Sequence, residues 1–274
     1  MSKIKNLKEK VGMVKSRTED LEESFLKDIR KAQVSLNPQW DSYKSDTFSP
    51  SSLGFCKRLV FFKRLGVEKD KRDLTDEWTY NVLGILNSGT SRHEDIQDEL
   101  EEAEELGILK NLDPKEVGKE AKQQGLNTEF LKYSDDGREG KFQNDDIKIR
   151  FYPDGLINYN GKDYVVEIKT ISLFGFNKID TEPLEKHLIQ GVCYSIALGI
   201  DRVIFIYEDR NFGKRKVVAL EVTEEMKQQV KDRVEDIDGY VQDKIVPPKN
   251  TDFCNYCDWN SECKKWDEGE KFKE

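Results

Sequence analysis

The stretch that decides the fold is YVVEIKT, from Tyr164 to Thr170, which follows the turn signal Asn160-Gly161. Its β-branched residues predict a buried strand, and the alternation of side chains along a strand places Glu167 and Lys169 on one face. A charged pair inside an apolar strand costs free energy unless it is paired, hydrogen-bonded or bound to a metal. The charged pair Glu167 and Lys169 therefore indicates a chemical role for this strand in addition to its place in the fold.

Further strands and helices are predicted before and after this strand in the sequence. Short runs rich in β-branched and aromatic residues predict further strands, and longer stretches at helical spacing predict helices between and after them. The order of these elements predicts a mixed α/β fold with a central mixed β-sheet flanked by helices. The predicted strands are 146–151, 156–159, 202–207 and 216–222, and the main predicted helices are 184–197 and 223–241.

The chain divides into three predicted parts. Residues 1–48 have apolar positions at helical spacing and are expected to form a helical arm for packing or assembly. Residues 49–246 form the core, with a helical insertion at about 106–138, and Ser49-Pro50 marks the start of its first helix, which ends at Gly66. Residues 247–274 are too short and too polar to hold a core alone, so they are expected to pack back on Cys56.

Composition restricts the partners. The 274 residues carry a net charge of −9, which argues against a nucleic-acid partner, but the segment 56–72 is locally basic. Two interpretations of it stay open: a DNA contact, or an amphipathic helix with Phe61 and Phe62 in the core. The absence of membrane-spanning or secretory patterns predicts a cytoplasmic protein without membrane contact. The DNA-contact interpretation would use Lys57, Arg58, Lys63 and Arg64.

The turn Tyr152-Pro153-Asp154-Gly155 adds a carboxylate next to a strand start. Asp154 and Glu167 could offer oxygen ligands to a hard divalent cation, Mg²⁺ or Mn²⁺. Lys169 could then orient a water molecule and offset charge on a phosphorane, which indicates phosphodiester hydrolysis. The alternative interpretation is a salt bridge at a sheet edge.

The order Pro153-Asp154 followed by Glu167-Ile168-Lys169 resembles the signature of the PD-(D/E)xK nuclease superfamily, which implies a restriction-endonuclease-like core. Gln190 and Tyr194, four apart on a predicted helix, match the Gln-x-x-x-Tyr motif of its RecB-like branch, and Gly89 to His93 matches its Gly-x-x-x-His motif. The resemblance implies that His93 and the Ile168 carbonyl join the two carboxylates as metal ligands. It also implies that Gln190 and Tyr194 contact DNA or position Lys169. His187 is a rival histidine, as a supporting residue or a phosphate contact.

The cysteines form a separate pattern. Cys254 and Cys257 make a Cys-x-x-Cys pair, Cys263 follows, and a tetrahedral thiolate site needs a fourth ligand. Cys193 lies in an apolar helix and is interpreted as a core residue, so Cys56 is the predicted fourth ligand. Thiols stay reduced in the cytoplasm, which favours metal ligation over disulfides. Spacing alone leaves zinc and iron–sulfur open.

One cysteine before the RecB-like core and three closely spaced cysteines after it resemble the cysteine pattern of the iron–sulfur nucleases. These are the AddB-type helicase-nucleases and the CRISPR-associated exonucleases. This resemblance implies a [4Fe-4S] cluster, with Zn²⁺ as the alternative. The chain has no Gly-x-x-x-x-Gly-Lys-Ser/Thr phosphate loop, so a helicase is not part of it.

These observations together predict a stand-alone DNA exonuclease dependent on Mg²⁺ or Mn²⁺. Its expected substrate is single-stranded DNA or DNA ends, in recombination, repair, CRISPR adaptation or phage DNA processing. The alternatives are a structure-specific or restriction-like endonuclease and a non-catalytic DNA-binding subunit. A helicase or recombination partner in trans and homo-oligomer formation are both left open.

Overall fold

The structure is a computed structural model that describes residues 19–36, 44–70, 77–249, 254 and 257–267. These residues fall into two compact units. The first contains helix α2 (Glu19–Leu36) and the part of helix α5 (Glu77–Glu105) before Gly89. The second contains everything else that is described, including all of the predicted site residues. The boundary predicted at residue 48 is wrong, because Phe48 is 2% exposed and belongs to the core of the second unit.

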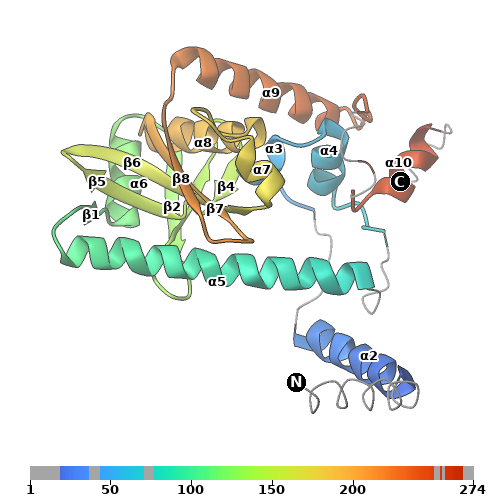
Figure 1. The fold of residues 1–274 in the computed structure, drawn as a ribbon. Coiled ribbons are helices and arrows are strands. Elements are labelled where there is room, and N and C mark those ends of the chain that lie inside the picture. Colours follow the sequence, from blue (N-terminus) through green and yellow to red (C-terminus); the bar gives the residue numbers. More distant parts are fainter. Residues whose placement is uncertain (1–18, 37–43, 71–76, 250–253, 255–256, 268–274) are drawn as a thin grey trace, which may run out of the picture. The chain divides into compact units, whose positions relative to one another are not determined.

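A five-stranded mixed sheet forms the centre of the second unit (Figure 1). Strand β6 lies in its middle, parallel to β7 and antiparallel to β5. This arrangement confirms the predicted mixed α/β fold with a central mixed sheet flanked by helices. In spatial order the strands are β1 (Lys110–Asn111), β5 (Gly155–Tyr159), β6 (Lys162–Ile171), β7 (Arg202–Asp209) and β8 (Arg215–Glu221).

The β5–β6 hairpin sets the register on which the site depends. Its two turn residues, Asn160 and Gly161, have φ values of 52° and 73°, the left-handed conformation for which Asn-Gly is favoured in tight hairpins. In this register Gly155 lies opposite Val166. Asp154 directly precedes Gly155 and Glu167 directly follows Val166, so the hairpin brings the two predicted carboxylates to the same end of β5.

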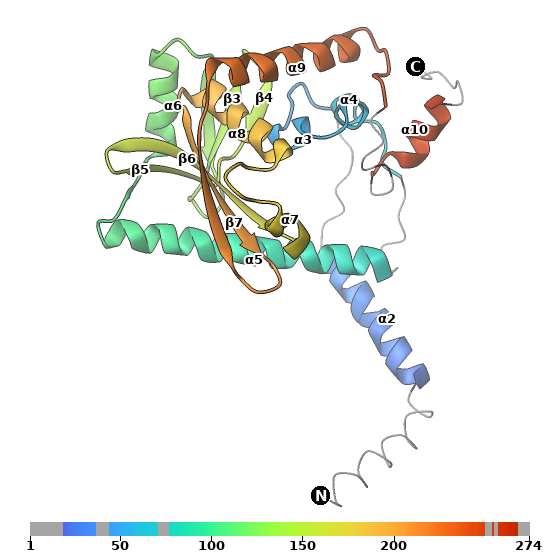
Figure 2. The ribbon, with the colours of Figure 1, turned by 45° about the horizontal axis from the view of Figure 1, so that its top comes forward.

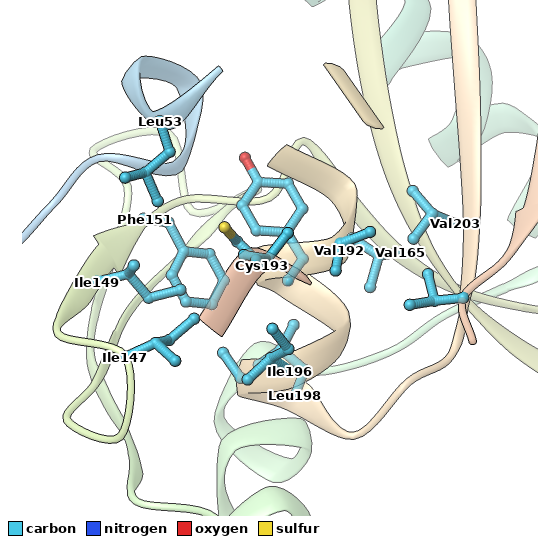
Figure 3. Packing of buried hydrophobic residues seen from close by; sticks show 14 of the residues in the cluster. Leu53, Ile147, Ile149, Phe151, Val165, Val192, Cys193, Ile196, Leu198 and Val203 are labelled. Carbon is cyan, nitrogen blue, oxygen red and sulfur yellow. The ribbon is translucent and has the colours of Figure 1, made fainter. Parts of the chain in front are cut away.

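Helices cover both faces of the sheet (Figures 1 and 2). One face packs against α8 (Glu185–Leu198) and α9 (Glu224–Gln242), and the other against α5 from Gly89 on. Alternate residues of β6 serve the two faces: Val165 joins the α8 side, where Figure 3 shows it near Val192, while Val166 and Ile168 pack with Ile96 of α5. Glu167 and Lys169 therefore point to the α8 side.

A second sheet of three antiparallel strands, β2-β3-β4, lies beside the first. Strand β2 of this sheet comes from the segment 106–138, which the sequence pattern predicts to be a helical insertion. That prediction is wrong where the segment forms β1, in the first sheet, and β2. Helix α6 is the only helix that the described segment 106–138 holds after α5 ends. Strand β2 pairs with β3, which lies outside the segment, and Phe130 of β2 packs in edge contact with Phe142 of β3. The bounds are α6 (Pro114–Gln123), β2 (Thr128–Tyr133), β3 (Gly140–Asn144) and β4 (Ile149–Phe151).

Four shorter helices complete the second unit. A helix starts after Ser49 with a proline in its first turn, as predicted, and a helix ends at Gly66 in a left-handed conformation, φ 68°. The prediction of one continuous helix between them is wrong, because the first helix ends at Leu53 and Gly54 caps it before the second begins at Lys57. None of the helices in the described ranges is long and apolar enough to cross a membrane. The bounds are α3 (Pro50–Leu53), α4 (Lys57–Leu65), α7 (Leu173–Asn177) and α10 (Asn260–Asp267).

The close approach of α8 to the sheet depends on Gly191. A Cβ atom there would lie 2.7 Å from Phe205 Cζ, whereas a Cβ at Gly239 of α9 would meet nothing within 4 Å. We expect Gly191→Ala to lower the free energy of unfolding by about 1–3 kcal/mol through overpacking. Gly239→Ala should raise it by up to about 1 kcal/mol, because alanine favours the helix. Urea unfolding of both variants checks this, and equal stability of the two would contradict the packing.

Candidate active site

Asp154 lies at the centre of the predicted catalytic residues. Its Oδ2 atom accepts a hydrogen bond of 2.5 Å from the backbone N–H of Ile168, and its Oδ1 atom lies 3.0 Å from His93 Nε2. The N–H and C=O of a strand residue point the same way, so the Ile168 carbonyl also faces the Asp154 side. The structure thus brings together the carboxylate, the histidine and the carbonyl that the family resemblance implies as metal ligands.

Glu139 is a further acidic residue at this position, and the sequence did not indicate it. One ligand atom each from His93, Glu139 and Asp154 lie within 4.8 Å of one another. Gln97 of α5 connects the group, because its Nε2 donates to Glu139 Oε1 at 2.9 Å and to the Asp154 carbonyl at 3.0 Å. Nothing in the local sequence separates Glu139 from the other acidic residues of this acidic chain.

A salt-bridged hairpin holds Glu139 over α5. Arg138, next to it in the β2–β3 loop, pairs with Asp98 at 2.5 Å and with Glu101 at 3.1 Å. Both carboxylates belong to α5, the helix that carries His93. The third ligand position therefore depends on contact between segments that are about forty residues apart in the sequence.

Glu167 is a buried carboxylate, 1% exposed, with unequal partners for its two oxygens. Oε1 forms an ion pair with Lys169 Nζ and accepts a 2.6 Å hydrogen bond from Gln190 Nε2. Oε2 is buried and has no hydrogen-bond partner in the described part of the chain. Burial, and then the charge of Asp154, raises the pKa of Glu167 to about 8, although Lys169 opposes the shift.

This environment fits a divalent cation. A buried carboxylate oxygen without a partner costs free energy, and a cation between Glu167 and Asp154 would remove that cost. Carboxylate oxygens and a backbone carbonyl are the ligands that hard cations prefer. The donor set and the orphaned oxygen therefore support the predicted Mg²⁺ or Mn²⁺ site.

Lys169 is positioned as a cation rather than as a base. Burial alone would lower its pKa, but Glu167 and Asp154 outweigh burial and raise the pKa above the ordinary lysine value. The side chain stays charged at neutral pH, and 22% of it is exposed. It can donate hydrogen bonds to a water molecule or to a phosphate oxygen at the site.

Gln190 and Tyr194 stand behind the carboxylate. They are 5% and 2% exposed, and Gln190 Nε2 donates to the Tyr194 hydroxyl oxygen at 2.6 Å. The Tyr194 hydroxyl donates onward to the Tyr152 carbonyl at 3.4 Å. The resemblance implies either contact with DNA or positioning of Lys169. The hydrogen bond of Gln190 goes to Glu167, the carboxylate that pairs with Lys169, and not to Lys169 itself.

The two histidines of the chain lie in opposite environments. For His93, burial would lower the pKa, but the hydrogen bond and charge of Asp154 raise it above 6.5. His187 is 6% exposed, and a 3.0 Å hydrogen bond joins its Nδ1 to the Tyr207 hydroxyl. Burial, followed by the charges of Lys169 and Lys186, lowers its pKa to about 3. His187 is therefore neutral at physiological pH and is a core residue rather than a phosphate contact.

This difference predicts how the protein titrates. His187 should remain neutral down to about pH 3, while its unfolded form takes up a proton below about 6.5, so its contribution to stability declines as pH falls through that window. Nitrogen NMR of the imidazole groups in metal-free protein tests this. His93→Gln leaves one histidine and assigns its signals, and a remaining imidazole that titrates near 6.5 would contradict the burial.

The predicted cysteine ligands surround one cavity of about 170 Å³. Cys56 at the start of α4 meets Cys254, Cys257 and Cys263 from the C-terminal segment there. Arg58 Nη1 donates to Cys263 Sγ at 3.1 Å and to Asp267 Oδ1 at 2.7 Å. The distribution of cysteines agrees with the interpretation that Cys56, and not Cys193, completes the set.

Cys193 lies in the main core. It is 0% exposed, and Figure 3 shows it among Leu53, Phe151 and Val192. Burial raises the pKa of its thiol to about 12. A thiol in this environment does not ionise at neutral pH, so Cys193 is unsuited to metal ligation.

The basic helix α4 is a structural element. Phe61 and Phe62 are 0% and 1% exposed and pack with Trp259, so the interpretation that these rings contact DNA is wrong. Arg64 is also buried, against Asp238 and the Phe48 ring. Lys57 and Arg58 contact α9 and the C-terminal segment, whereas Lys63 is exposed, so a DNA contact through these cations stays a prediction. Lys57 pairs with Asp236, Arg58 with Asp267, and Lys63 with Ser52.

Comparisons with known proteins give only distant similarities. No family model matches the chain, and no curated protein matches it. The crystal structure of SSO0001 is similar at 13% identity and a TM-score of 0.44, covering 88% of this chain and 95% of that one. LHK-Exo in complex with dAMP is similar at 12% identity and a TM-score of 0.45, covering 75% and 93%. The alkaline exonuclease LHK-Exo from Laribacter hongkongensis is similar at 11% identity and a TM-score of 0.42, with the same coverage.

Proposed function

We propose that this protein is a divalent-cation-dependent deoxyribonuclease that hydrolyses phosphodiester bonds as an exonuclease on single-stranded DNA or DNA ends. The observation that carries the proposal is the buried, partnerless Oε2 of Glu167, which lies in a site with Asp154 and a charged Lys169. A salt bridge at a sheet edge, the alternative interpretation, would leave both the orphaned oxygen of Glu167 and the neighbouring His93–Glu139–Asp154 group unexplained.

The residues divide the chemistry between them. Asp154, Glu167 and the Ile168 carbonyl would hold the Mg²⁺ or Mn²⁺ ion, with His93 and Glu139 beside Asp154 Oδ1. A bound divalent cation polarises a phosphoryl oxygen and lowers the pKa of water, which is the chemistry that this reaction needs.

Lys169 orients the attacking water and offsets the negative charge that develops on the phosphate, because its ammonium group stays protonated. The water oxygen forms the new bond to phosphorus and gives up a proton to solvent, while the bond to the leaving sugar oxygen breaks and that oxygen takes up a proton from solvent. Gln190 donates a hydrogen bond to Glu167 Oε1 and so keeps the carboxylate in one orientation.

Lys169→Met tests this mechanism. The substitution keeps the apolar stem and removes the charge, and we expect kcat to fall by about 10²–10³, the cost of losing one transition-state donor. Lys162→Met is a matched control at the exposed end of the same strand and should retain activity. The assay uses single-stranded DNA, duplex DNA and circular DNA, labelled at either end, with Mg²⁺ or Mn²⁺.

The same assay separates the alternatives. Cleavage of linear but not circular DNA supports an exonuclease, whereas cleavage of circles would identify an endonuclease. Wild-type activity in Lys169→Met would contradict the mechanism. A wild-type protein that binds DNA without cleaving it in either cation would favour the non-catalytic subunit.

We further propose that Cys56, Cys254, Cys257 and Cys263 hold a [4Fe-4S] cluster. A zinc site needs thiolate sulfurs about 3.8 Å apart, as tetrahedral Zn–S bonds of about 2.3 Å require. No three cysteine sulfurs of the described residues lie within 4.8 Å of one another, and the four surround a cavity instead. This arrangement favours a group larger than a single ion.

Cys257→Ala should give a colourless protein with a lower melting temperature, because the cluster joins the C-terminal segment to α4. Cys193→Ala is the control, and it should keep the colour. Protein purified without oxygen should contain iron and acid-labile sulfide in equal amounts. Zinc in place of iron and sulfide would overturn the cluster assignment, although the same four cysteines would then be the zinc ligands.

A further inference from the structure

Two phenylalanine side chains are exposed at the carboxyl ends of β6 and β7. Phe174 in α7 is 73% exposed and Phe212 in the β7–β8 turn is 69% exposed. They are the only exposed phenylalanines among the described residues of the second unit. Exposure of single aromatic rings is common, so what matters is which groups lie around these two rings.

The backbone under both rings is firmly held. In the turn, the carboxylate of the fully buried Asp209 accepts hydrogen bonds from the backbone N–H groups of Asn211, at 3.1 Å, and Phe212, at 3.2 Å. The Arg210 N–H donates to the Ile171 carbonyl at 3.0 Å and joins the turn to the segment that leads into α7. The two rings are therefore presented by connected and ordered backbone.

Each ring has a lysine beside it. Lys178 Nζ lies 4.2 Å from the centroid of the Phe174 ring, and Lys214 Nζ lies 6.0 Å from that of Phe212. Neither lysine forms an ion pair with another residue in the described part of the chain. Arg215, by contrast, is bound to Glu99 and Glu208. The surface thus combines aromatic faces with cations that are available to a polyanion.

This surface borders the proposed active site. Lys169 lies on β6, two residues before Ile171, where the segment carrying Phe174 begins. Arg92, next to His93, pairs with Glu208, and a Cβ at Gly213 would lie 3.7 Å from Arg92 Nη1. The turn with Phe212 therefore lies beside the part of α5 that carries Arg92 and His93.

The other side of Asp154 is unsuited to a DNA strand. It opens into a groove of about 510 Å³ whose lining includes Glu101, Glu104, Glu105 and Asp113. Like charge repels the phosphate backbone there. The surface at the carboxyl ends of β6 and β7 instead carries the positive charges of Lys178 and Lys214.

We propose that Phe174 and Phe212 form a stacking platform for unpaired bases of the DNA strand whose phosphate enters the active site, with Lys178 and Lys214 contacting its backbone. Aromatic faces combined with cations bind single strands without sequence preference, because every base has a π-face. The inference deepens the proposed nuclease function and rests on it. It gives the substrate class as a strand with unpaired bases.

The test measures binding by fluorescence anisotropy, with Ca²⁺ as the non-catalytic cation. The probes are a labelled oligothymidine and an abasic oligonucleotide of the same length. Wild-type protein should bind the oligothymidine more tightly than the abasic strand. Phe174→Ala and Phe212→Ala should each weaken oligothymidine binding by about tenfold and leave abasic binding unchanged, because each removes a ring on which a base stacks. Phe212→Trp should retain the affinity.

Tyr159→Ala is the matched control. Tyr159 is 40% exposed at the other end of the β5–β6 hairpin, and its loss should change neither affinity. Oligothymidine binding that survives both alanine substitutions would overturn the platform, even if the wild-type protein cleaves DNA. Base-dependent binding lost in these variants of a protein that does not cleave would support the platform and reject the nuclease. A wild-type protein that binds neither strand overturns the platform, and the cleavage assay on labelled DNA decides the nuclease separately.

Discussion

The second unit is organised around one buried carboxylate. Glu167 lies on the middle strand of the sheet and is 1% exposed. Its Oε1 pairs with Lys169 and accepts a hydrogen bond from Gln190, whereas its Oε2 has no partner among the residues that the structure describes. Such a group costs free energy in the metal-free protein, which is why its pKa rises to about 8. The fold keeps it in place because β6 is hydrogen-bonded on both sides and packed on both faces.

Helix α8 connects the two proposed metal centres. Glu185 and Ile189 line the cysteine cavity, while Gln190, next to Ile189, donates to Glu167 and Tyr194 lies one turn further on. The packing of Gly191 against Phe205 sets how closely this helix approaches the sheet. A cluster at the cysteines would therefore stabilise the same helix that orients the catalytic carboxylate, which gives a structural cofactor a physical route to the active site.

Several features could be predicted because they depend on local pattern. Asn160-Gly161 predicts its hairpin since both residues tolerate positive φ, and alternation puts Glu167 and Lys169 on one face. The apolar surroundings of Cys193 predict its burial. Helix α4 shows the limit of such reasoning: basic residues around two phenylalanines suit either DNA or a core, and only the packing of Trp259 over the rings decides for the core.

The sequence by itself determined the strand, its turn and the chemical types at the site, because these follow from side-chain alternation, backbone preference and residue spacing. Tertiary structure alone decided that Glu139 joins His93 and Asp154, since Arg138 must first pair with α5. It also decided that Phe174 and Phe212 stay exposed while Phe61 and Phe62 are buried. Burial and contact between distant segments depend on the whole chain, so no local pattern contains them.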